Sequence, residues 1–175
     1  MYLIILCILS SIPMVDIIIS SIVSDVMTYE FSYNISKNMV RNVIIVNLAH
    51  LFLYYDVKMV MIRSFVELII INFLCKWCLD RERPISAKNY TPIYEISLSK
   101  NFKKNQSFPS GHVAGYYLNY LMFKNYSYWM SIFFYCLTML VLYARINLKK
   151  HYLSDCLFAI LISEMSFNLF YLKYF

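Results

Sequence analysis

Long apolar stretches separated by short polar ones fill most of this chain, and they limit what it can fold into. The first runs from Tyr2 to Val23, a shorter one from Val40 to Tyr55, and a third from Met59 to Trp77. Crossing the hydrocarbon core of a bilayer takes roughly 20 apolar residues in a helix, with a range of about 17–25. The first stretch has no basic cluster before it and is too long for the core of a signal peptide, so we expect it to be retained. These lengths predict membrane-spanning helices.

The second half of the chain continues the pattern. Apolar residues run from Gly111 to Phe123, from Tyr126 to Tyr143 and from Tyr152 to Tyr171. A polar and basic loop, Cys78 to Phe108, precedes them, and a short polar bridge, Arg145 to Lys150, separates the last two. Backbone groups in lipid must be hydrogen-bonded within the protein, which helices achieve. The sequence therefore predicts an all-α fold, a bundle of six transmembrane helices with an active site at one membrane face.

The composition agrees with a protein that lies in the bilayer. Hydrophobic residues make up 61% of the chain and charged residues only 15%, whereas a soluble domain is about half apolar and about a quarter charged. The net charge of +6 would suit nucleic-acid binding, but the basic residues flank apolar blocks, as is typical of membrane proteins. No linker or internal repeat divides the chain. We expect one integral membrane domain over residues 1–175 and no nucleic-acid partner.

Three short clusters hold polar residues that a purely structural helix bundle does not need. They are Lys76–Pro84 at the end of the third predicted helix, Pro109–His112 at the start of the fourth, and Arg145–Asp155 between the fifth and sixth. Ionisable groups near a bilayer are costly and require a reason. With six spans, the loops after the first, third and fifth helices lie on one side of the membrane. All three clusters are therefore predicted to meet there.

The cations in these clusters favour a dianionic ligand. Lys76, Arg83 and Arg145 would bring three positive charges together, and arginine forks match phosphate oxygens well. Ser110 and Gly111 open a predicted helix, where free backbone N–H groups and the positive end of the helix dipole attract anions. The missing Cβ at Gly111 would let a phosphate approach the backbone closely. The pattern indicates a phosphate-binding site.

Two histidines complete the parts of a phosphoryl-transfer site. His151 and Asp155 are four residues apart, on one face of the sixth predicted helix. The aspartate can accept the proton of one ring nitrogen, which fixes the tautomer and leaves the other lone pair free to attack. His112 is suited to protonate a leaving oxygen. Metal binding by the same groups is the competing interpretation, but three Lys and Arg side chains would repel a cation, so we expect no metal.

The three clusters together resemble the signatures of the type 2 phosphatidic acid phosphatase superfamily, which are K-x6-R-P, P-S-G-H and S-R-x5-H-x3-D. The first reads KWCLDRERP over residues 76–84 and matches at both ends, and the second, PSGH, is complete. The third reads ARINLKKHYLSD over residues 144–155 and matches at Arg145, His151 and Asp155. The resemblance covers the organisation of the whole chain, because the family core is also six helices with signatures at these places.

The resemblance implies an integral membrane phosphatase that hydrolyses a phosphomonoester or pyrophosphate on a lipid, without a metal or other cofactor. His151 would form a phosphohistidine, Asp155 would orient it, and His112 would protonate the leaving alkoxide and later activate water. The other matched residues would hold the phosphoryl oxygens: Lys76, Arg83, Ser110, Gly111 and Arg145. Phosphatidic acid, phosphatidylglycerol phosphate and polyprenyl pyrophosphate fit equally well as substrates.

One position departs from the family pattern. The serine that precedes the arginine of the third signature is Ala144 here. A lost hydroxyl contact to phosphate costs about 1 kcal/mol, which is a several-fold effect on rate rather than a loss of the chemistry. The departure keeps open a second interpretation, a catalytically silent phospholipid-binding membrane protein of the same fold.

Other polar residues are interpreted as structural. Cys75 and Cys78 form a C-x-x-C, but a redox pair needs a thioredoxin-like context, so we interpret them as small apolar residues at a helix end. Arg81 lies in the variable part of the first signature and is given no catalytic role. Asp16, inside the first predicted helix, is expected to be buried and hydrogen-bonded.

Two indications oppose each other on the orientation of the site. Most of the 16 Lys and Arg residues fall on the predicted active-site face, which by the positive-inside rule favours the cytoplasm. Bacterial members of the family that the chain resembles usually face outward, and three of those charges serve the expected chemistry. We therefore expect an active site on the non-cytoplasmic face.

Overall fold

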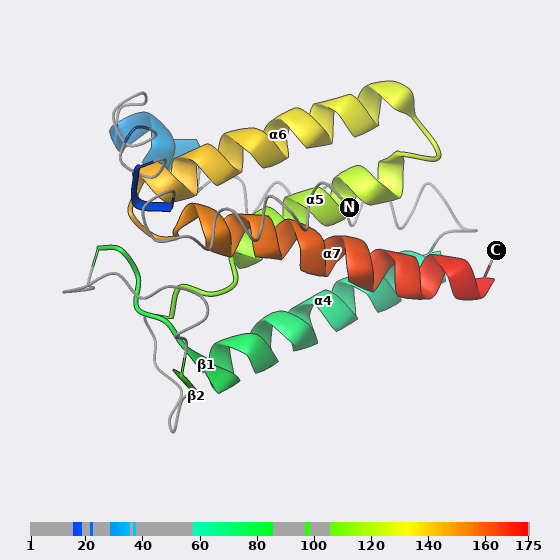
Figure 1. The fold of residues 1–175 in the computed structure, drawn as a ribbon. Helices are drawn as coiled ribbons and strands as arrows, with labels where there is room; N and C mark the ends of the chain where they lie inside the picture. The colour runs from blue at the N-terminus through cyan, green and yellow to red at the C-terminus, as the bar shows by residue number, and fades with distance from the viewer. Residues whose placement is uncertain are drawn as a thin grey trace.

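Four helices make up most of the described structure, a computed structural model that describes residues 16–18, 22, 29–35, 37, 58–85, 97–98 and 106–174. They are α4 (Lys58–Cys78), α5 (Gly111–Phe123), α6 (Tyr128–Asn147) and α7 (Leu153–Tyr174) (Figure 1). These confirm the third to sixth predicted helices. The first predicted helix is described only at residues 16–18 and 22, which are helical, and the second, Val40–Tyr55, lies outside the described residues.

Short strands lie within the polar stretch that follows α4. β1 (Leu79–Asp80) pairs antiparallel with β2 (Ser97–Leu98), and an isolated bridge joins Glu82 to Gln106. These pairings bring the two ends of a long connection together. The segment that leaves α4 therefore lies beside the segment that enters α5.

Two predicted boundaries around the third signature are wrong. α6 continues to Asn147, so Arg145 lies in its last turn rather than in a polar bridge. The helix continues because Arg145 and Asn147 are buried, at 8% and 7% exposure, and make polar contacts inside the bundle. α7 begins at Leu153, so His151 precedes this helix instead of lying on its face. Lys149, with a left-handed φ of 50°, turns the chain between the two helices.

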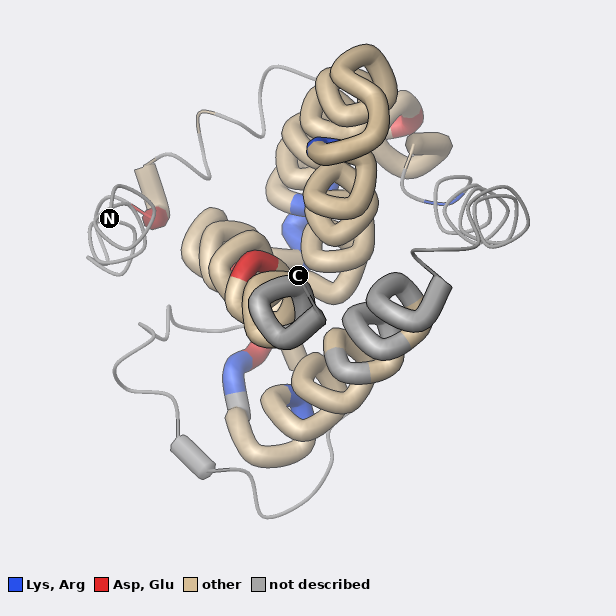
Figure 2. The backbone as a smooth tube through the Cα atoms, turned by 90° about the vertical axis from the view of Figure 1, so that its right-hand side faces the viewer, with Lys and Arg blue, Asp and Glu red and all other residues tan. Residues whose placement is uncertain are grey.

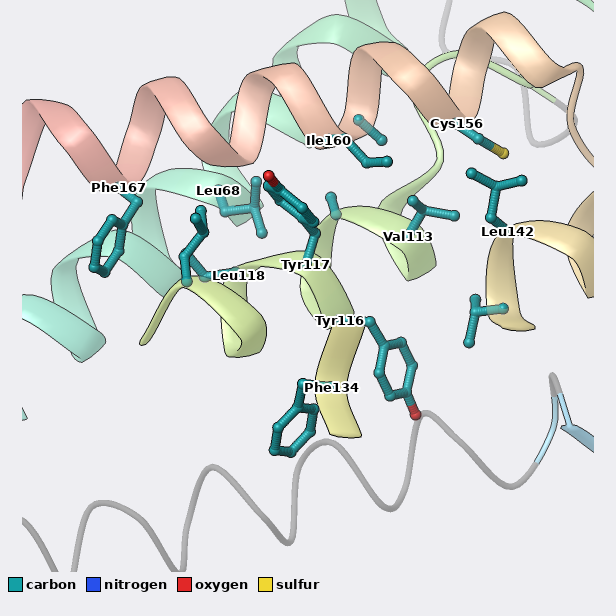
Figure 3. Packing of buried hydrophobic residues seen from close by; sticks show 14 of the residues in the cluster. Leu68, Val113, Tyr116, Tyr117, Leu118, Phe134, Leu142, Cys156, Ile160 and Phe167 are labelled. Atoms are coloured by element: carbon teal, nitrogen blue, oxygen red, sulfur yellow. The ribbon is translucent and has the colours of Figure 1, made fainter. Parts of the chain in front are cut away.

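The core of the described bundle is built around α5, which contacts α4, α6 and α7. Most of the side chains of α5 are buried, and those of Val113 and Leu118 are completely buried. Figure 3 shows Leu118 near Leu68 of α4 and Phe167 of α7. Because lipid is as apolar as these side chains, such a bundle is held together by close packing and internal polar contacts.

The exterior and the buried charges differ from those of a soluble protein, although the core is apolar. Large apolar residues point outward, such as Phe73 of α4 at 51% exposure and Trp129 of α6 at 78%, while Asp16, Arg81 and Asp155 are completely buried. The described parts of the helices carry few Lys, Arg, Asp or Glu residues (Figure 2). In the described part of the chain, α6 is the one helix both long and apolar enough to cross a membrane. Apolar outer faces of this extent favour contact with lipid.

The polar clusters lie together at one end of the bundle. Figure 1 shows the C-terminal ends of α4 and α6 and the N-terminal ends of α5 and α7 at the same end. The three signatures occupy these four helix ends. The topology therefore brings together segments that are far apart in the sequence.

Candidate active site

The first signature enters the site from α4. Lys76 lies in the last turn of this helix, and the chain then passes through β1 to Arg83, whose Nε donates to the carbonyl of Gln106 at 3.4 Å. The Ile85 N–H donates to the carbonyl of Lys149 at 3.0 Å. These contacts fix the segment against the turn between α6 and α7, which carries the third signature.

The second signature forms the start of α5. Ser110 is the N-cap residue, but its side chain does not cap the helix, and its N–H donates to the carbonyl of Asp155 at 3.2 Å. Its Oγ is buried and has no hydrogen-bond partner among the described residues. A Cβ added to Gly111 would meet Asn72 Oδ1 of α4 at 3.6 Å, an ordinary contact distance. A buried hydroxyl without a partner is costly, and at a helix N-terminus it suits an anionic ligand.

The ring of His151 is held in a defined tautomer. Its Nδ1 lies 2.6 Å from the carbonyl oxygen of Ser107, and its Nε2 lies 3.4 Å from a guanidinium nitrogen of Arg145. A carbonyl oxygen can only accept, so Nδ1 carries the proton. In the neutral ring Nε2 then holds a lone pair, which faces the cation. This is the arrangement that a nucleophilic imidazole needs.

The surroundings of His151 keep its ring neutral. The side chain is 2% exposed. Burial lowers the pKa of His151 well below 6.5, and the charges of Arg145, Lys76 and Arg83 lower it further, against the opposing effect of the hydrogen bond to Ser107. Burial disfavours the charged form, and like charges add to this. The Nε2 lone pair is therefore available at neutral pH.

Asp155 lies near His151 but is not its direct hydrogen-bond partner. Its Oδ2 is 3.9 Å from Nδ1, because the carbonyl of Ser107 occupies the closer position. Oδ2 instead accepts from the Ser107 hydroxyl and from the Tyr152 N–H, the latter at 2.9 Å. Tyr152 immediately precedes α7, so Asp155 reaches back to close the start of that helix, as the acidic residue of a capping box does. Ser107 therefore contacts both residues, with its hydroxyl donating to Asp155 and its carbonyl accepting from His151.

His112 shares its electrostatic surroundings with His151. It is the second residue of α5 and half-buried. The charges of Arg145, Lys76 and Arg83 act on both imidazoles. His112 of the second signature therefore lies near three cations of the first and third signatures. The three clusters were predicted to meet in this way because their loops lie on one side of the membrane.

Comparison with known proteins assigns the chain to a family. A model of the PAP2 superfamily matches residues 58–175. The chain belongs to the PAP2 superfamily. Its fold is similar to the crystal structure of a transmembrane PAP2-type phosphatidylglycerolphosphate phosphatase from Bacillus subtilis, with a TM-score of 0.68 and 18% identity over 98% of this chain and 92% of that one. No curated protein matches the chain.

The residue that departs from the PAP2 pattern lies inside α6. Ala144 is completely buried beside Arg145, and its carbonyl accepts from the Leu148 N–H at 3.0 Å where the helix ends. This backbone hydrogen bond does not depend on the side chain at position 144, so the alanine leaves the helix end that carries Arg145 in place. Membership of the PAP2 superfamily supports a phosphatase activity for this chain, and the departure at position 144 does not change that membership.

Three residues of the site region were not predicted from the sequence to act there. Ser107 lies just before the second signature, yet its carbonyl and hydroxyl contact both His151 and Asp155. Arg81 forms buried ion pairs with both Asp16 and Asp155. Asp16 is buried and hydrogen-bonded, as expected. In the sequence, Ser107 is distinguished only by its position just before the second signature, because serines are common in turns of every kind.

Two alternative chemistries were also considered for these residues. Among the residues that the structure describes, no group of three or more His, Cys, Asp and Glu side chains is placed to hold a metal ion. Cys75 and Cys78 are free thiols in the last turn of α4, one half-buried and the other exposed. Neither observation gives support to a metal centre or a redox pair.

Proposed function

We propose that this protein is an integral membrane lipid phosphatase that hydrolyses a phosphomonoester or pyrophosphate through a phosphohistidine intermediate. The observation that carries the proposal is the orientation of His151, which donates through Nδ1 to Ser107 and directs its Nε2 lone pair toward Arg145. A phosphoryl group bound beside these two residues would meet a nucleophile and a cation at once. PAP2 membership gives independent support.

The proposed reaction has two steps that use the two histidines in turn. In the first, His151 Nε2 attacks phosphorus, the bond from phosphorus to the leaving oxygen breaks, and His112 gives its proton to that oxygen. The bound dianion offsets the three cations and favours the proton on His112 beforehand. In the second step His112 takes a proton from water, the oxygen of this water attacks phosphorus, and the P–N bond breaks to release inorganic phosphate.

Charge stabilisation in both steps falls to groups that stand ready before the substrate arrives. Lys76, Arg83 and Arg145 face the negative charge that develops on the phosphoryl oxygens, and Ser110 offers a buried hydroxyl. Such preorganised donors supply a large share of the rate in phosphoryl transfer. We infer that the enzyme needs no metal, since three fixed cations take the place a metal would have.

The substrate class follows from the site at the end of an apolar bundle. A lipid would keep its acyl or prenyl tail in the bilayer while its phosphate enters the site. The Bacillus subtilis protein of similar fold is described as a phosphatidylglycerolphosphate phosphatase, which supports that lipid as one candidate beside phosphatidic acid and polyprenyl pyrophosphate.

A phosphate-release assay on the detergent-purified protein tests the proposal. The three candidate lipids are compared with and without EDTA, using wild type, His151→Ala and, as a matched control, His50→Ala, which changes the histidine outside all three signatures. We expect release that EDTA does not alter, that His151→Ala abolishes and that His50→Ala retains. Folded wild-type protein that binds these lipids without releasing phosphate would instead support the catalytically silent alternative.

A further inference from the structure

Arg81 is the largest fully buried side chain among the described residues, with no exposed surface. One guanidinium nitrogen, NH1, donates to Asp155 Oδ1 at 2.5 Å and to Ser154 Oγ at 2.9 Å. The other, NH2, donates to Asp16 Oδ2 at 3.3 Å. The guanidinium also lies 4.3 Å from the centre of the Tyr152 ring. Arg81 thus joins the first predicted helix, the first signature and the start of α7.

Asp16 and Ser154 complete this buried group. Asp16 Oδ1 accepts from the Ser154 N–H at 3.1 Å, and Asp16 Oδ2 accepts from the Ser154 hydroxyl at 2.5 Å. Asp16 is itself completely buried. Two carboxylates therefore enclose one guanidinium, and each has further donors. Buried charges are tolerated when they are paired and hydrogen-bonded in this way.

The group is connected to His151 by two routes that meet at Ser107. The carbonyl of Arg81 accepts from the Ser107 N–H at 2.7 Å. Its guanidinium holds one oxygen of Asp155, whose other oxygen accepts from the Ser107 hydroxyl. The carbonyl of Ser107 in turn accepts from His151 Nδ1. Arg81 therefore fixes the residue that sets the tautomer of the histidine, through both its backbone and its side chain.

We propose that Arg81, held by Asp16, is a positioning residue that keeps Ser107 and Asp155 where they fix the orientation of His151. This inference rests on the proposed phosphatase function, because it assigns Arg81 a part in the same site. It also revises the expectation that the variable stretch of the first signature has no part in catalysis. The guanidinium of Arg81 is fully buried and donates to Asp155, Ser154 and Asp16, so it is engaged within the protein rather than presented to a ligand.

A positioning role and a phosphate-binding role predict different kinetics. Loss of a phosphate ligand weakens the binding of substrate and of phosphate analogues. Loss of a positioning residue leaves binding nearly unchanged and slows the chemical step, because misplacement of a reacting group by about 1 Å can cost roughly 100-fold in rate. The distinction lies in whether kcat or KM changes.

The test compares Arg81→Met, Arg81→Lys and Asp16→Asn with Glu82→Gln, an exposed neighbour in the same segment that serves as control. Purified proteins are assayed for kcat, KM and inhibition by orthovanadate, and their tautomers are read by nitrogen NMR on isotope-labelled histidine. We expect Arg81→Met to lower kcat about 100-fold with KM and vanadate inhibition within about twofold of wild type. Arg81→Lys and Asp16→Asn should show smaller losses in kcat, and Glu82→Gln none.

Several results would overturn the inference. One is an Arg81→Met variant whose kcat equals that of wild type. Another is a raised KM with weaker vanadate inhibition in the same variant, which would make Arg81 a phosphate ligand. If Arg81→Met does not purify as folded protein, Asp16→Asn decides, and an unchanged kcat there rejects the proposal. The failure of the phosphatase function and the failure of the positioning role are distinguishable. Wild-type protein that releases no phosphate rejects the phosphatase function. The NMR measurement does not need an active enzyme, and a His151 signal in Arg81→Met that is unchanged from wild type rejects the positioning role.

Discussion

The two nitrogens of His151 have different partners, and this difference can be measured directly. Nδ1 donates to Ser107, Nε2 faces Arg145, and the pKa of the ring lies well below 6.5 because of burial and the nearby cations. A group with a lowered pKa stays deprotonated until the pH falls through that value. In nitrogen NMR of labelled histidine we expect the His151 signals to show a neutral, Nδ1-protonated ring at pH 7 and no titration near 6.5.

The signals are assigned by their loss in His151→Ala. Glu82→Gln serves as a control, because Glu82 is exposed and is not among the groups that shift the pKa of His151. An imidazole that titrates with a midpoint near 6.5, or one protonated at Nε2, would contradict the proposed nucleophile. The pH dependence of kcat/KM should reflect the same protonation state, because it reports on the ionisable groups of the free enzyme.

The two glycines of the chain allow a matched test of phosphate approach. A Cβ at Gly111 would meet Asn72 Oδ1 at 3.6 Å, and one at Gly115 would meet nothing within 4 Å. Both glycines lie in α5 without a positive φ, so alanine should be tolerated at each and should favour the helix by up to about 1 kcal/mol. We expect Gly111→Ala to keep its melting temperature but lose about tenfold in kcat/KM, which is about 1.4 kcal/mol.

Gly115→Ala, one turn further along the helix, should keep both its melting temperature and its activity. Equal activities for the two variants would show that phosphate does not approach the backbone at Gly111. A fall in the melting temperature of Gly111→Ala alone would instead assign this glycine to packing against α4.

The matched positions of the three signatures could be predicted from the sequence, whereas their supporting residues could not. Lys76, His112 and His151 stand out because charged and polar groups are rare in this chain. Arg81 and Asp16 make their contacts across 65 residues of sequence, and Asp16 reaches Ser154 across 138. No local spacing reports such contacts. The direct pairing predicted for His151 and Asp155 is not seen, because Ser107 lies closer to the ring.

At the level of elements, hydropathy located the helices and failed at their polar ends. α5 begins and ends where the apolar stretch does, from Gly111 to Phe123. α6 extends past its apolar stretch, and its last turn buries Arg145 and Asn147 inside the bundle. The β1–β2 pairing was not predicted, since strands of two residues leave no periodic pattern.

The outer face of α6 offers a second matched pair, which tests insertion in lipid. Tyr128 and Tyr135 are exposed at 70% and 45%, one in the first turn of the helix and the other deeper. An aspartate deep in a membrane-spanning helix costs about 2.5–3.5 kcal/mol, whereas one in the first turn interacts favourably with the helix dipole. We expect Tyr135→Asp to reduce the yield of folded protein in the membrane fraction severely and Tyr128→Asp to leave it unchanged.

The comparison is made by fluorescence-detected size exclusion of detergent extracts from equal amounts of cells. Tyr135→Phe controls for the contact of this ring with Tyr120 and should behave as wild type. Equal yields for the two aspartate variants would contradict a lipid-facing α6, because an exposed position in water accepts aspartate at either site.

At the level of the whole molecule, the polarity of the bundle is what connects fold and function. Charged groups are buried at one end of the helices, and many large apolar side chains of these helices are exposed. A soluble substrate would gain nothing from such an exterior. A lipid phosphate approaches within the bilayer and needs polar groups only at the depth of its headgroup. The single domain over residues 1–175 and its first two helices stay predictions from the sequence.

The orientation of the bundle can be tested with one cysteine at each end. Glu82 is exposed in the segment of the first signature, and Lys124 is exposed in the turn between α5 and α6 at the opposite end of α5. Glu82→Cys and Lys124→Cys are introduced separately into a chain whose native cysteines are replaced by alanine. If the helices span the membrane, a membrane-impermeant maleimide applied to intact cells should label one of the two variants and reach the other only after lysis. We expect labelling at Glu82→Cys, because bacterial members of the family usually carry the site on the non-cytoplasmic face. Labelling at Lys124→Cys alone would place the site in the cytoplasm, in agreement with the distribution of Lys and Arg. Labelling of both variants in intact cells would contradict a bundle that spans the membrane between the two positions.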